Sequence, residues 1–317
     1  MATPTTAIGI DFGGTSIKSA VVRGGAIVQR GTLIDPQAFA SSADLIDELV
    51  RLIESLRAEH SDVAGVGIGL PGFVDSAHGI VHELTNVAGW DEVPLCQILH
   101  ERTGLAAAIE NDVNAMTYAE WKHGAARGGK HTLCITLGTG VGSGIILDGK
   151  LWRGTDGSAA EIGHTTVDPF GGPQCKCGNF GCLEMYASAT AMVRMTRESL
   201  ERFPGSSLHG QCLSAKTIYD AGKAGDELAI EVFRNVGDYL GVALSNLINL
   251  LGPEVIVIGG GAANGWCLFE ESMRKQIDSR AFPWLSRSVK IKPAECGDNA
   301  GLLGAAQLAF VSHVFES

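Results

Sequence analysis

The sequence lacks a long apolar run and is short of basic residues. Its 317 residues include 24 Lys and Arg against 35 Asp and Glu, a formal net charge of −11. This deficit of positive charge argues against binding a nucleic-acid backbone, although backbone N–H groups and a metal ion can still hold one nucleotide. No segment is long and apolar enough to span a membrane, and the 45% apolar content is too high for a disordered chain. We expect a soluble folded protein with neither nucleic acid nor membrane as a partner.

Two further absences concern localisation and the thiols. The first six residues are polar and show no signal-peptide pattern before the first apolar segment. Of the eight Cys residues, five are scattered without a pairing pattern: Cys96, Cys134, Cys212, Cys267 and Cys296. Scattered thiols suit a reducing compartment, where they serve as small buried apolar side chains. The expected location is cytoplasmic.

Short apolar strands separated by glycine turns open both halves of the chain. Residues 7–11 and 16–22 form one such pair, and residues 133–137 and 143–147 repeat it at a domain-sized interval. The remaining pattern predicts strands at 26–34, 63–70, 106–110, 254–258 and 289–293, and helices at 43–59, 113–123, 187–203, 214–224, 226–251 and 299–315. Strands alternating with helices favour an α/β fold with a mixed sheet in each half.

Three glycine-rich turns follow apolar strands, and each is a candidate phosphate-binding loop. They are Asp11-Phe12-Gly13-Gly14-Thr15, Gly138-Thr139-Gly140-Val141-Gly142 and Gly259-Gly260-Gly261. Taken alone, each is as well explained as a tight hairpin. Together they favour nucleotide phosphate binding, because glycine lets successive N–H groups approach an anion, and Asp11 could hold a hydrated magnesium ion. The Walker and dinucleotide-binding patterns are both missing.

One His and three Cys lie within a short segment that also holds two carboxylates. His164, Cys175, Cys177 and Cys182 supply the four ligands of a closed tetrahedral zinc site, with Gly178 and Gly181 allowing the loop to fold around an ion. Glu161 and Glu184 bracket the ligands, which suggests that the metal shapes a polar pocket. The alternatives are a zinc-stapled loop without chemistry, or unrelated thiols.

The segment Glu110-Asn111-Asp112-Val113-Asn114-Ala115 lies between an expected strand and an expected helix. Asp112 would fall at or near the helix N-cap, where a carboxylate is often only a cap. The functional interpretation is that Asp112 accepts a proton from a substrate hydroxyl while Asn111 fixes a neighbouring hydroxyl, as phosphoryl transfer requires.

In combination these motifs resemble the ROK family of sugar kinases. That family carries Asp-x-Gly-Gly-Thr, Gly-x-Pro-Gly, Asn-Asp-x-Asn-Ala, Gly-Thr-Gly-x-Gly, Glu-x-Gly-His and Cys-x-Cys-Gly-x-x-Gly-Cys-x-Glu. All six occur here in that order from Asp11 to Glu184, with Gly69-Leu70-Pro71-Gly72 as the second. Within the family, Thr85-Asn86-Val87-Ala88-Gly89-Trp90, the segment 182–188 and Ser214-Ala215-Lys216 are most similar to ATP-dependent glucokinases.

The resemblance implies an α/β, actin-like (ribonuclease H-like) two-domain ATPase fold with a central cleft and a zinc-binding loop. The small domain would comprise residues 1–115 plus a C-terminal helix at about 300–317, and the large domain residues 116–300. It further implies transfer of the γ-phosphoryl group of ATP to a hexose, with magnesium, a structural zinc ion and a homodimeric assembly.

The resemblance also assigns residues to roles. Asp112 is the general base. The implied hexose ligands are Gly69, Pro71, Gly72, Asn86, Asn111, Asp112, Glu161, His164 and Glu184. The implied nucleotide and magnesium ligands are Asp11, Gly13, Gly14, Thr15, Lys18, Gly138, Thr139, Gly140, Gly142, Gly259, Gly260 and Gly261. The zinc ligands are His164, Cys175, Cys177 and Cys182, and His164 would use its second nitrogen on the sugar.

Several alternatives remain open at the level of sequence. The acceptor could be N-acetylmannosamine, N-acetylglucosamine, fructose, allose or mannose in place of glucose, and the donor could be polyphosphate, although no basic tract is present to bind it. The same family contains sugar-responsive repressors, but the phosphate loop begins at Asp11 and leaves no room for a DNA-binding domain. A non-catalytic sugar sensor is disfavoured by the presence of Asp11, Thr15 and Asp112 together.

Overall fold

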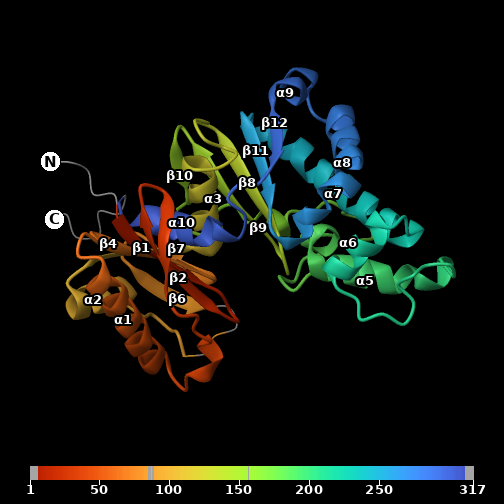
Figure 1. Cartoon of the computed structure of the whole chain (residues 1–317). Coiled ribbons are helices and arrows are strands. Elements are labelled where there is room, and N and C mark those ends of the chain that lie inside the picture. The colour runs from red at the N-terminus through yellow and green to blue at the C-terminus, as the bar shows by residue number, and fades with distance from the viewer. Residues whose placement is uncertain (1–5, 85–86, 88, 156, 311–317) are drawn as a thin grey trace. The chain divides into compact units, whose positions relative to one another are not determined.

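The computed structural model describes residues 6–84, 87, 89–155 and 157–310, which fall into two compact units (Figure 1). Unit 1 comprises the described residues of 1–128, 151–159 and 296–317, and unit 2 comprises 129–150 and 160–295. The chain therefore passes between the units four times. Within the described residues, none of the helices combines the length and the apolar character needed to span a membrane.

Unit 1 is built on one mixed sheet with the strand order β3-β2-β1-β4-β7. β1 pairs antiparallel with β2 and parallel with β4, and β4 pairs parallel with β7. The elements of unit 1 are β1 (Thr6–Phe12), β2 (Ile17–Arg23), β3 (Ala26–Arg30), η1 (Pro36–Ala38), α1 (Ser42–Glu59), β4 (Gly65–Leu70), β5 (Gly72–Asp75), β6 (Ile80–Leu84), α2 (Leu95–Thr103), β7 (Ala106–Asn111), α3 (Asp112–Lys122), η5 (Gly297–Asn299) and α10 (Ala300–Leu308).

Helix α1 covers one face of this sheet. Ser41 caps the helix, because its side chain accepts a hydrogen bond from the backbone N–H of Asp44. The apolar face of α1, including Leu45, Leu49 and Ile53, joins the inward side chains of β1 and β4 in one buried cluster. The predicted helix at 43–59 is thus confirmed, and the burial of its leucines explains its position.

Helix α10 packs against unit 1 from the far end of the sequence. It lies beside β1 and β4 in Figure 1. A Cβ built on Gly9 would come within 2.1 Å of Leu302 O, and a Cβ built on Gly67 would come within 1.8 Å of Ala305 O. On its other side, a Cβ on Gly304 would lie 1.7 Å from Ala115 O of α3. The backbone of α10 therefore contacts the backbone of its neighbours directly, and only glycine fits at these three positions.

Unit 2 holds a second mixed sheet, with the strand order β10-β9-β8-β11-β12. Its elements are β8 (Thr132–Leu137), β9 (Val141–Leu147), β10 (Lys150–Trp152, which ends within unit 1), η2 (Ile162–His164), α4 (Glu184–Ala187), α5 (Ala189–Ser199), η3 (Leu200–Arg202), α6 (Ala215–Lys223), α7 (Glu227–Leu251), β11 (Val255–Gly259), η4 (Gly261–Gly265), α8 (Trp266–Arg280), α9 (Pro283–Ser288) and β12 (Lys290–Pro293). The antiparallel pair β8–β9 confirms the repeat of the strand–turn–strand arrangement of β1–β2.

The long helix α7 organises the core of unit 2. Asp226 caps its N-terminus and Gly252 ends it in the left-handed conformation. Two glycines on α7, Gly237 and Gly241, let α8 approach closely. A Cβ on Gly237 would lie 2.3 Å from a backbone oxygen of α8, and a Cβ on Gly241 would lie 2.5 Å from another. Aliphatic side chains of α7, α8, β8 and β11 form one continuous buried cluster.

The structure differs from the sequence-based prediction in several places. The helix expected at 187–203 is divided, because Ser188 has extended backbone angles and its side chain caps α5 by accepting from Ala191 N. The strand expected at 26–34 ends at Arg30, and only an isolated bridge links Ile34 to Ile17. The elements β5, β6, α2, β10 and α9 were not predicted. Asn86 and the end of the last predicted helix, beyond residue 310, lie outside the described residues.

Candidate functional site

The carboxyl ends of β1, β4 and β7 bring several predicted site residues of unit 1 into one row. Asp11 on β1 pairs with Gly69 on β4, and Gly69 pairs in turn with Glu110 on β7. The next pair in register is Leu70 with Asn111. In sheets of this type the carboxyl edge is where ligands bind, so the register alone gathers Asp11, Gly69 and Asn111 at one edge.

The turn after Asp11 has the form expected of a glycine-rich loop. Gly13 N donates to Ser16 O at 3.0 Å, which closes the β1–β2 turn, and Thr15 is exposed at its tip. Lys18 stands opposite Asp11 across the hairpin. Burial raises the pKa of Asp11 above its ordinary value of 3.8, and the positive charge of Lys18 opposes that rise. Gly301 leaves room for the Asp11 carboxylate, since a Cβ there would lie 2.5 Å from Asp11 Cγ.

Asn111, and not Asp112, caps helix α3. The Asn111 side-chain oxygen accepts from Val113 N at 3.0 Å and from Asn114 N at 3.3 Å. Asp112 is the first residue of the helix, and its Oδ1 accepts from Val113 N at 2.9 Å. The interpretation of Asp112 as the cap residue is therefore unnecessary, because the neighbouring amide does this work. Asn111 Nδ2 also lies 3.5 Å from Gly72 O, next to Pro71 in the Gly-x-Pro-Gly turn.

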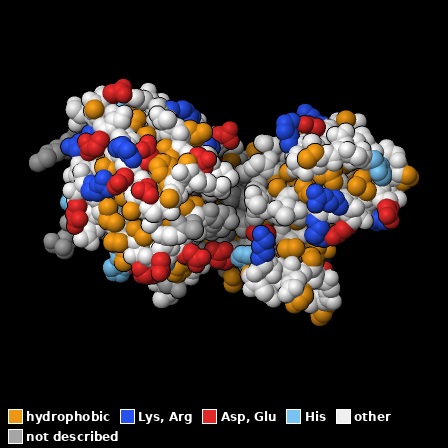
Figure 2. All heavy atoms as spheres, turned by 90° about the horizontal axis from the view of Figure 1, so that it is seen from below, with side chains coloured by type: hydrophobic (Ala, Val, Ile, Leu, Met, Phe, Trp, Pro, Cys, Tyr) orange, Lys and Arg blue, Asp and Glu red, His pale blue; other side chains and the backbone are white. Residues whose placement is uncertain are grey.

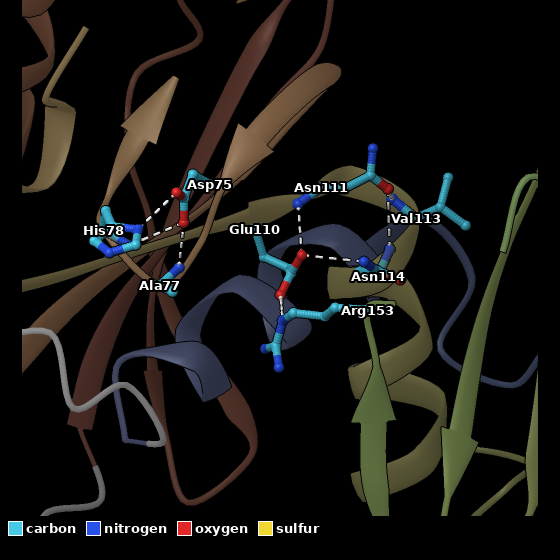
Figure 3. Close-up of polar contacts among 8 residues, drawn as sticks. All are labelled: Asp75, Ala77, His78, Glu110, Asn111, Val113, Asn114 and Arg153. Carbon is cyan, nitrogen blue, oxygen red and sulfur yellow. Dashed lines mark hydrogen bonds and ion pairs between the residues drawn. The ribbon is translucent and has the colours of Figure 1, made fainter. Parts of the chain in front are cut away.

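The sequence did not point to a buried ion pair beneath this cap. Glu110 is almost fully buried, and its carboxylate accepts from Arg153 Nε at 2.6 Å, Asn111 N at 3.0 Å and Asn114 Nδ2 at 3.0 Å (Figure 3). Arg153 lies 43 positions further along the chain in an irregular segment. No periodicity or motif could have paired the two residues.

In unit 2, two of the glycine-rich loops lie together at the ends of paired strands. β8 and β11 run parallel, with Thr136 paired to Gly259. Gly260 has a φ of +88°, and a Cβ there would lie 2.5 Å from Leu137 O. Gly138 N donates to Gly140 O at 2.9 Å, so the loop opens a hairpin, as expected. Thr139, Gly260 and Gly261 are exposed at these loops, with N–H groups of the kind that hold phosphate oxygens.

Glu184 contacts the first of these loops. Its Oε2 accepts a hydrogen bond from Val141 N at 3.0 Å, and a Cβ on Gly140 would come within 2.3 Å of the same oxygen. Gly140 is thus required where it stands, because any side chain would displace the carboxylate. The structure connects a predicted sugar ligand with a predicted phosphate loop in the same unit.

The four predicted zinc ligands converge in unit 2. One ligand atom from each of His164, Cys175, Cys177 and Cys182 can be chosen so that all lie within 4.8 Å of one another. Cys177 Sγ lies 3.7 Å from Cys182 Sγ, and Cys175 Sγ lies 3.5 Å from His164 Nδ1. Tetrahedral zinc with ordinary bond lengths needs separations of about 3.8 Å between two sulfurs and about 3.6 Å between sulfur and nitrogen. The donor set and its spacing therefore fit zinc.

The geometry of His164 leaves one ring nitrogen outside the cluster. His164 Nδ1 is the atom next to Cys175 Sγ, so Nε2 is available for another partner. His164 ends the short helix η2, and Glu161 is the exposed residue that precedes that helix. Ala160, one residue earlier, has a φ of +71°, a conformation that costs a non-glycine residue free energy.

The predicted site residues therefore fall into two groups. Unit 1 holds Asp11, Gly13, Gly14, Thr15, Lys18, Gly69, Pro71, Gly72, Asn111 and Asp112, and unit 2 holds Gly138, Thr139, Gly140, Gly142, Glu161, His164, Cys175, Cys177, Cys182, Glu184, Gly259, Gly260 and Gly261. Asn86 is outside the described residues.

Comparison with known proteins gives one family and several full-length relatives. Residues 7–311 match the ROK family. The glucokinase of Halalkalibacterium halodurans is 36% identical over 95% of this chain and 94% of its own length. A ROK family glucokinase from Streptomyces griseus, solved in complex with glucose and AMPPNP, is 33% identical, with a TM-score of 0.78 over 96% of this chain and 98% of that one. The Escherichia coli transcriptional repressor Mlc is 32% identical over 85% of this chain but only 67% of its own length.

Proposed function

Because this chain belongs to the ROK family and is a sugar kinase with the actin-like ATPase fold, we propose that it phosphorylates glucose to glucose 6-phosphate with ATP as donor. The observation that supports this most strongly is the shared edge of the unit 1 sheet. Asp11 with its glycine turn ends β1, and Asp112 begins the helix that follows β7. A carboxylate suited to a magnesium nucleotide and a carboxylate suited to an acceptor hydroxyl thus stand at one edge.

In this proposal Asp112 accepts the proton of the acceptor hydroxyl as that hydroxyl attacks the γ-phosphorus. The Asp112 Oδ1 interaction with Val113 N fixes the carboxylate at the helix start. Asn111 presents its amide Nδ2 beside Gly72 O, where it can bind a second hydroxyl. General-base assistance of this kind contributes about 10²–10⁴-fold to a rate.

The glycine loops are proposed to hold the phosphates. Thr15 and Thr139 add hydroxyl donors to the backbone N–H groups of their turns, and Gly259, Gly260 and Gly261 provide the loop near adenosine. Magnesium, when bound, would neutralise charge on the β- and γ-phosphates, and Asp11 is the residue proposed to hold it through water.

The zinc cluster is proposed to orient a sugar ligand. Zinc would be held by His164 Nδ1 and the three Cys thiolates, and it would supply a fixed ring orientation rather than reaction chemistry. His164 Nε2, Glu161 and Glu184 then provide hydrogen-bonding groups for hexose hydroxyls. His164 Nε2–H would donate, and the Glu161 and Glu184 carboxylates would accept, so this fixed set of polar groups matches neighbouring hydroxyls of a hexose.

ATP is preferred over polyphosphate as the proposed donor because of the distribution of charge. On the face shown in Figure 2, Lys and Arg side chains are scattered among acidic and uncharged ones. The net charge of −11 is also unfavourable for binding an anionic polymer. N-acetylmannosamine, N-acetylglucosamine, fructose and mannose remain alternative acceptors, since the proposed ligands contact hydroxyls that these sugars share.

An ADP-release assay tests the proposal directly. We expect glucose to give the highest kcat/KM in a panel of hexoses and N-acetylhexosamines, with ATP far more effective than polyphosphate. Asp112→Asn should lower kcat by about two orders of magnitude or more while glucose still binds. A preference for another sugar would replace glucose in the proposal, and near-normal turnover in the variant would remove Asp112 from the mechanism.

A sugar-responsive regulator is the second candidate, because Mlc is 32% identical to this chain. It is distinguished by the same assay, since a sensor would bind glucose without releasing ADP. The presence of Asp11, Thr15 and Asp112 supports the kinase.

A further inference from the structure

We propose that Arg153 is a positioning residue for the base, holding the first turn of α3 in its working geometry through the buried carboxylate of Glu110. The inference rests on the proposed function, because it assigns Arg153 a part in placing Asp112. Arg153 directly follows strand β10, and it lies in the segment 151–159, which belongs to unit 1.

The two oxygens of Glu110 have different partners (Figure 3). Oε1 accepts from Asn111 N and from Asn114 Nδ2, both at 3.0 Å. Oε2 accepts from Arg153 Nε at 2.6 Å. The Glu110 carboxylate therefore binds residues on both sides of Asp112 through Oε1, while Oε2 binds the guanidinium.

Burial explains why this carboxylate needs the arginine. The Glu110 side chain is only 2% exposed, whereas that of Arg153 is 38% exposed. A buried carboxylate with only neutral donors is unfavourable, so without Arg153 it would turn toward water. This change weakens the bonds from Oε1 to Asn111 and Asn114, and the first turn of α3 loses its fixed position.

Arg153 is itself held in place by its own segment. Ala159 N donates to Arg153 O at 3.2 Å. Gly154, the next residue, has a φ of +73°, and a Cβ there would lie 2.8 Å from Ala159 Cβ. The backbone that carries the Arg153 guanidinium is therefore tied to Ala159.

A double-mutant cycle of Arg153 and Glu110 tests the inference. Arg153→Met keeps the stem but leaves the Glu110 charge uncompensated, and we expect kcat to fall by about 10–100-fold, with a smaller change in KM. Glu110→Gln retains the Oε1 acceptor but turns an amide donor toward the guanidinium, so it should also lower kcat. The double variant removes both charges and keeps Oε1, so it should be more active than Arg153→Met alone.

Arg102→Met is the matched control. Arg102 is 40% exposed, close to the 38% of Arg153, but its partner Asp47 is 55% exposed instead of buried. This variant should keep kcat within about twofold, because exposed ion pairs contribute little. An Arg153→Met enzyme as active as Arg102→Met, or a double variant no better than Arg153→Met, would overturn the inference.

Amide exchange separates this inference from the proposed function. In Arg153→Met, but not in Arg102→Met, the amides of Asn111, Val113 and Asn114 should exchange faster, and in the double variant they should regain protection. If the unmodified protein releases no ADP with any hexose, the proposed function fails while the exchange result still decides whether Arg153 positions the helix start. Unchanged exchange in Arg153→Met would refute that role whatever the substrate.

Discussion

The carboxylate of Glu184 accepts a hydrogen bond from the backbone N–H of Val141 at 3.0 Å. Glu184 lies two positions after Cys182, a proposed zinc ligand, and the contact joins it to a loop proposed to bind phosphate. Only Oε2 is engaged with the loop in this contact, and a carboxylate offers a second oxygen to a sugar hydroxyl. One side chain can therefore serve both substrates of a kinase.

Replacing Glu184 should weaken the binding of both substrates. In Glu184→Ala the Val141 N–H loses its acceptor, and we expect glucose and AMPPNP, measured separately by calorimetry, each to bind about tenfold or more weakly. Glu184→Gln keeps a side-chain oxygen for Val141 N, so nucleotide affinity should stay within about threefold. Loss of glucose binding with unchanged AMPPNP affinity in the Ala variant would show that the contact has no influence on the loop.

Removing one proposed zinc ligand should lower metal content and sugar affinity together. Cys177 is exposed, so Cys177→Ser changes little packing but deprives the cluster of a thiolate. His164 then loses its fixed orientation, and glucose affinity should fall by about tenfold or more, with bound zinc followed by elemental analysis. Cys212→Ser, an exposed thiol outside the cluster, is the control and should change neither quantity. Zinc loss with unaltered glucose binding would show that the metal only stabilises the fold and does not orient a sugar ligand.

Ala160 offers a way to stabilise the protein next to the site. Its φ of +71° is unfavourable for any side chain with a Cβ, and Ala160→Gly should raise the free energy of unfolding by about 0.5–1 kcal/mol in urea titrations. Ala159→Gly, at a position whose φ is not positive, should lower it by a similar amount because glycine gains freedom in the unfolded chain. If both variants are destabilised alike, the backbone conformation at residue 160 carries no strain.

Asp226 should make the stability of unit 2 depend on pH. Partial burial on its own would raise the pKa of Asp226, but hydrogen bonds from Ala229 N, from Ser207 and from the Ser206 hydroxyl outweigh it and lower the pKa below 3.8. A lowered pKa in the folded state adds stability above the unfolded-state pKa, and this stability is lost as pH falls through the folded-state value.

The comparison of Asp226→Asn and Asp226→Ala isolates that effect. Both variants should be less stable than the parent at pH 7, with the Ala variant lower by about 1 kcal/mol because it also loses the cap of α7. The difference between the parent and Asp226→Asn should shrink as the pH of the urea titrations falls below about 4. A difference that is constant with pH would contradict the assignment.

Much of the fold follows from pattern alone, for physical reasons. The helices α1 and α7 have long apolar faces, so their limits were predicted to within a residue or two. The hairpin β5–β6 and helix α2 escaped prediction because their elements are short and depend on tertiary contacts. Helix α2 begins after Pro94 without a side-chain cap. The division of the helix at Ser188 likewise depends on one local hydrogen bond.

The parts of the candidate site that could be predicted are those whose residues lie close together in the sequence. The four proposed zinc ligands occur within one short segment, and the structure brings them together. The Glu110–Arg153 pair could not be found in the same way, because Arg153 acts through a loop that returns to unit 1 from another part of the chain. Long-range ion pairs leave no local signature in a sequence.

The close packing of α10 on Gly9 of β1 and Gly67 of β4 has a consequence for synthesis of the protein. The strands that it covers, β1 and β4, leave the ribosome early, whereas residues 300–308 emerge only after the whole of unit 2. The surface around Gly9 and Gly67, which α10 covers in the folded protein, therefore stays exposed while roughly the length of a further domain is translated. During that interval the nascent first unit should be the part of the protein most in need of a chaperone.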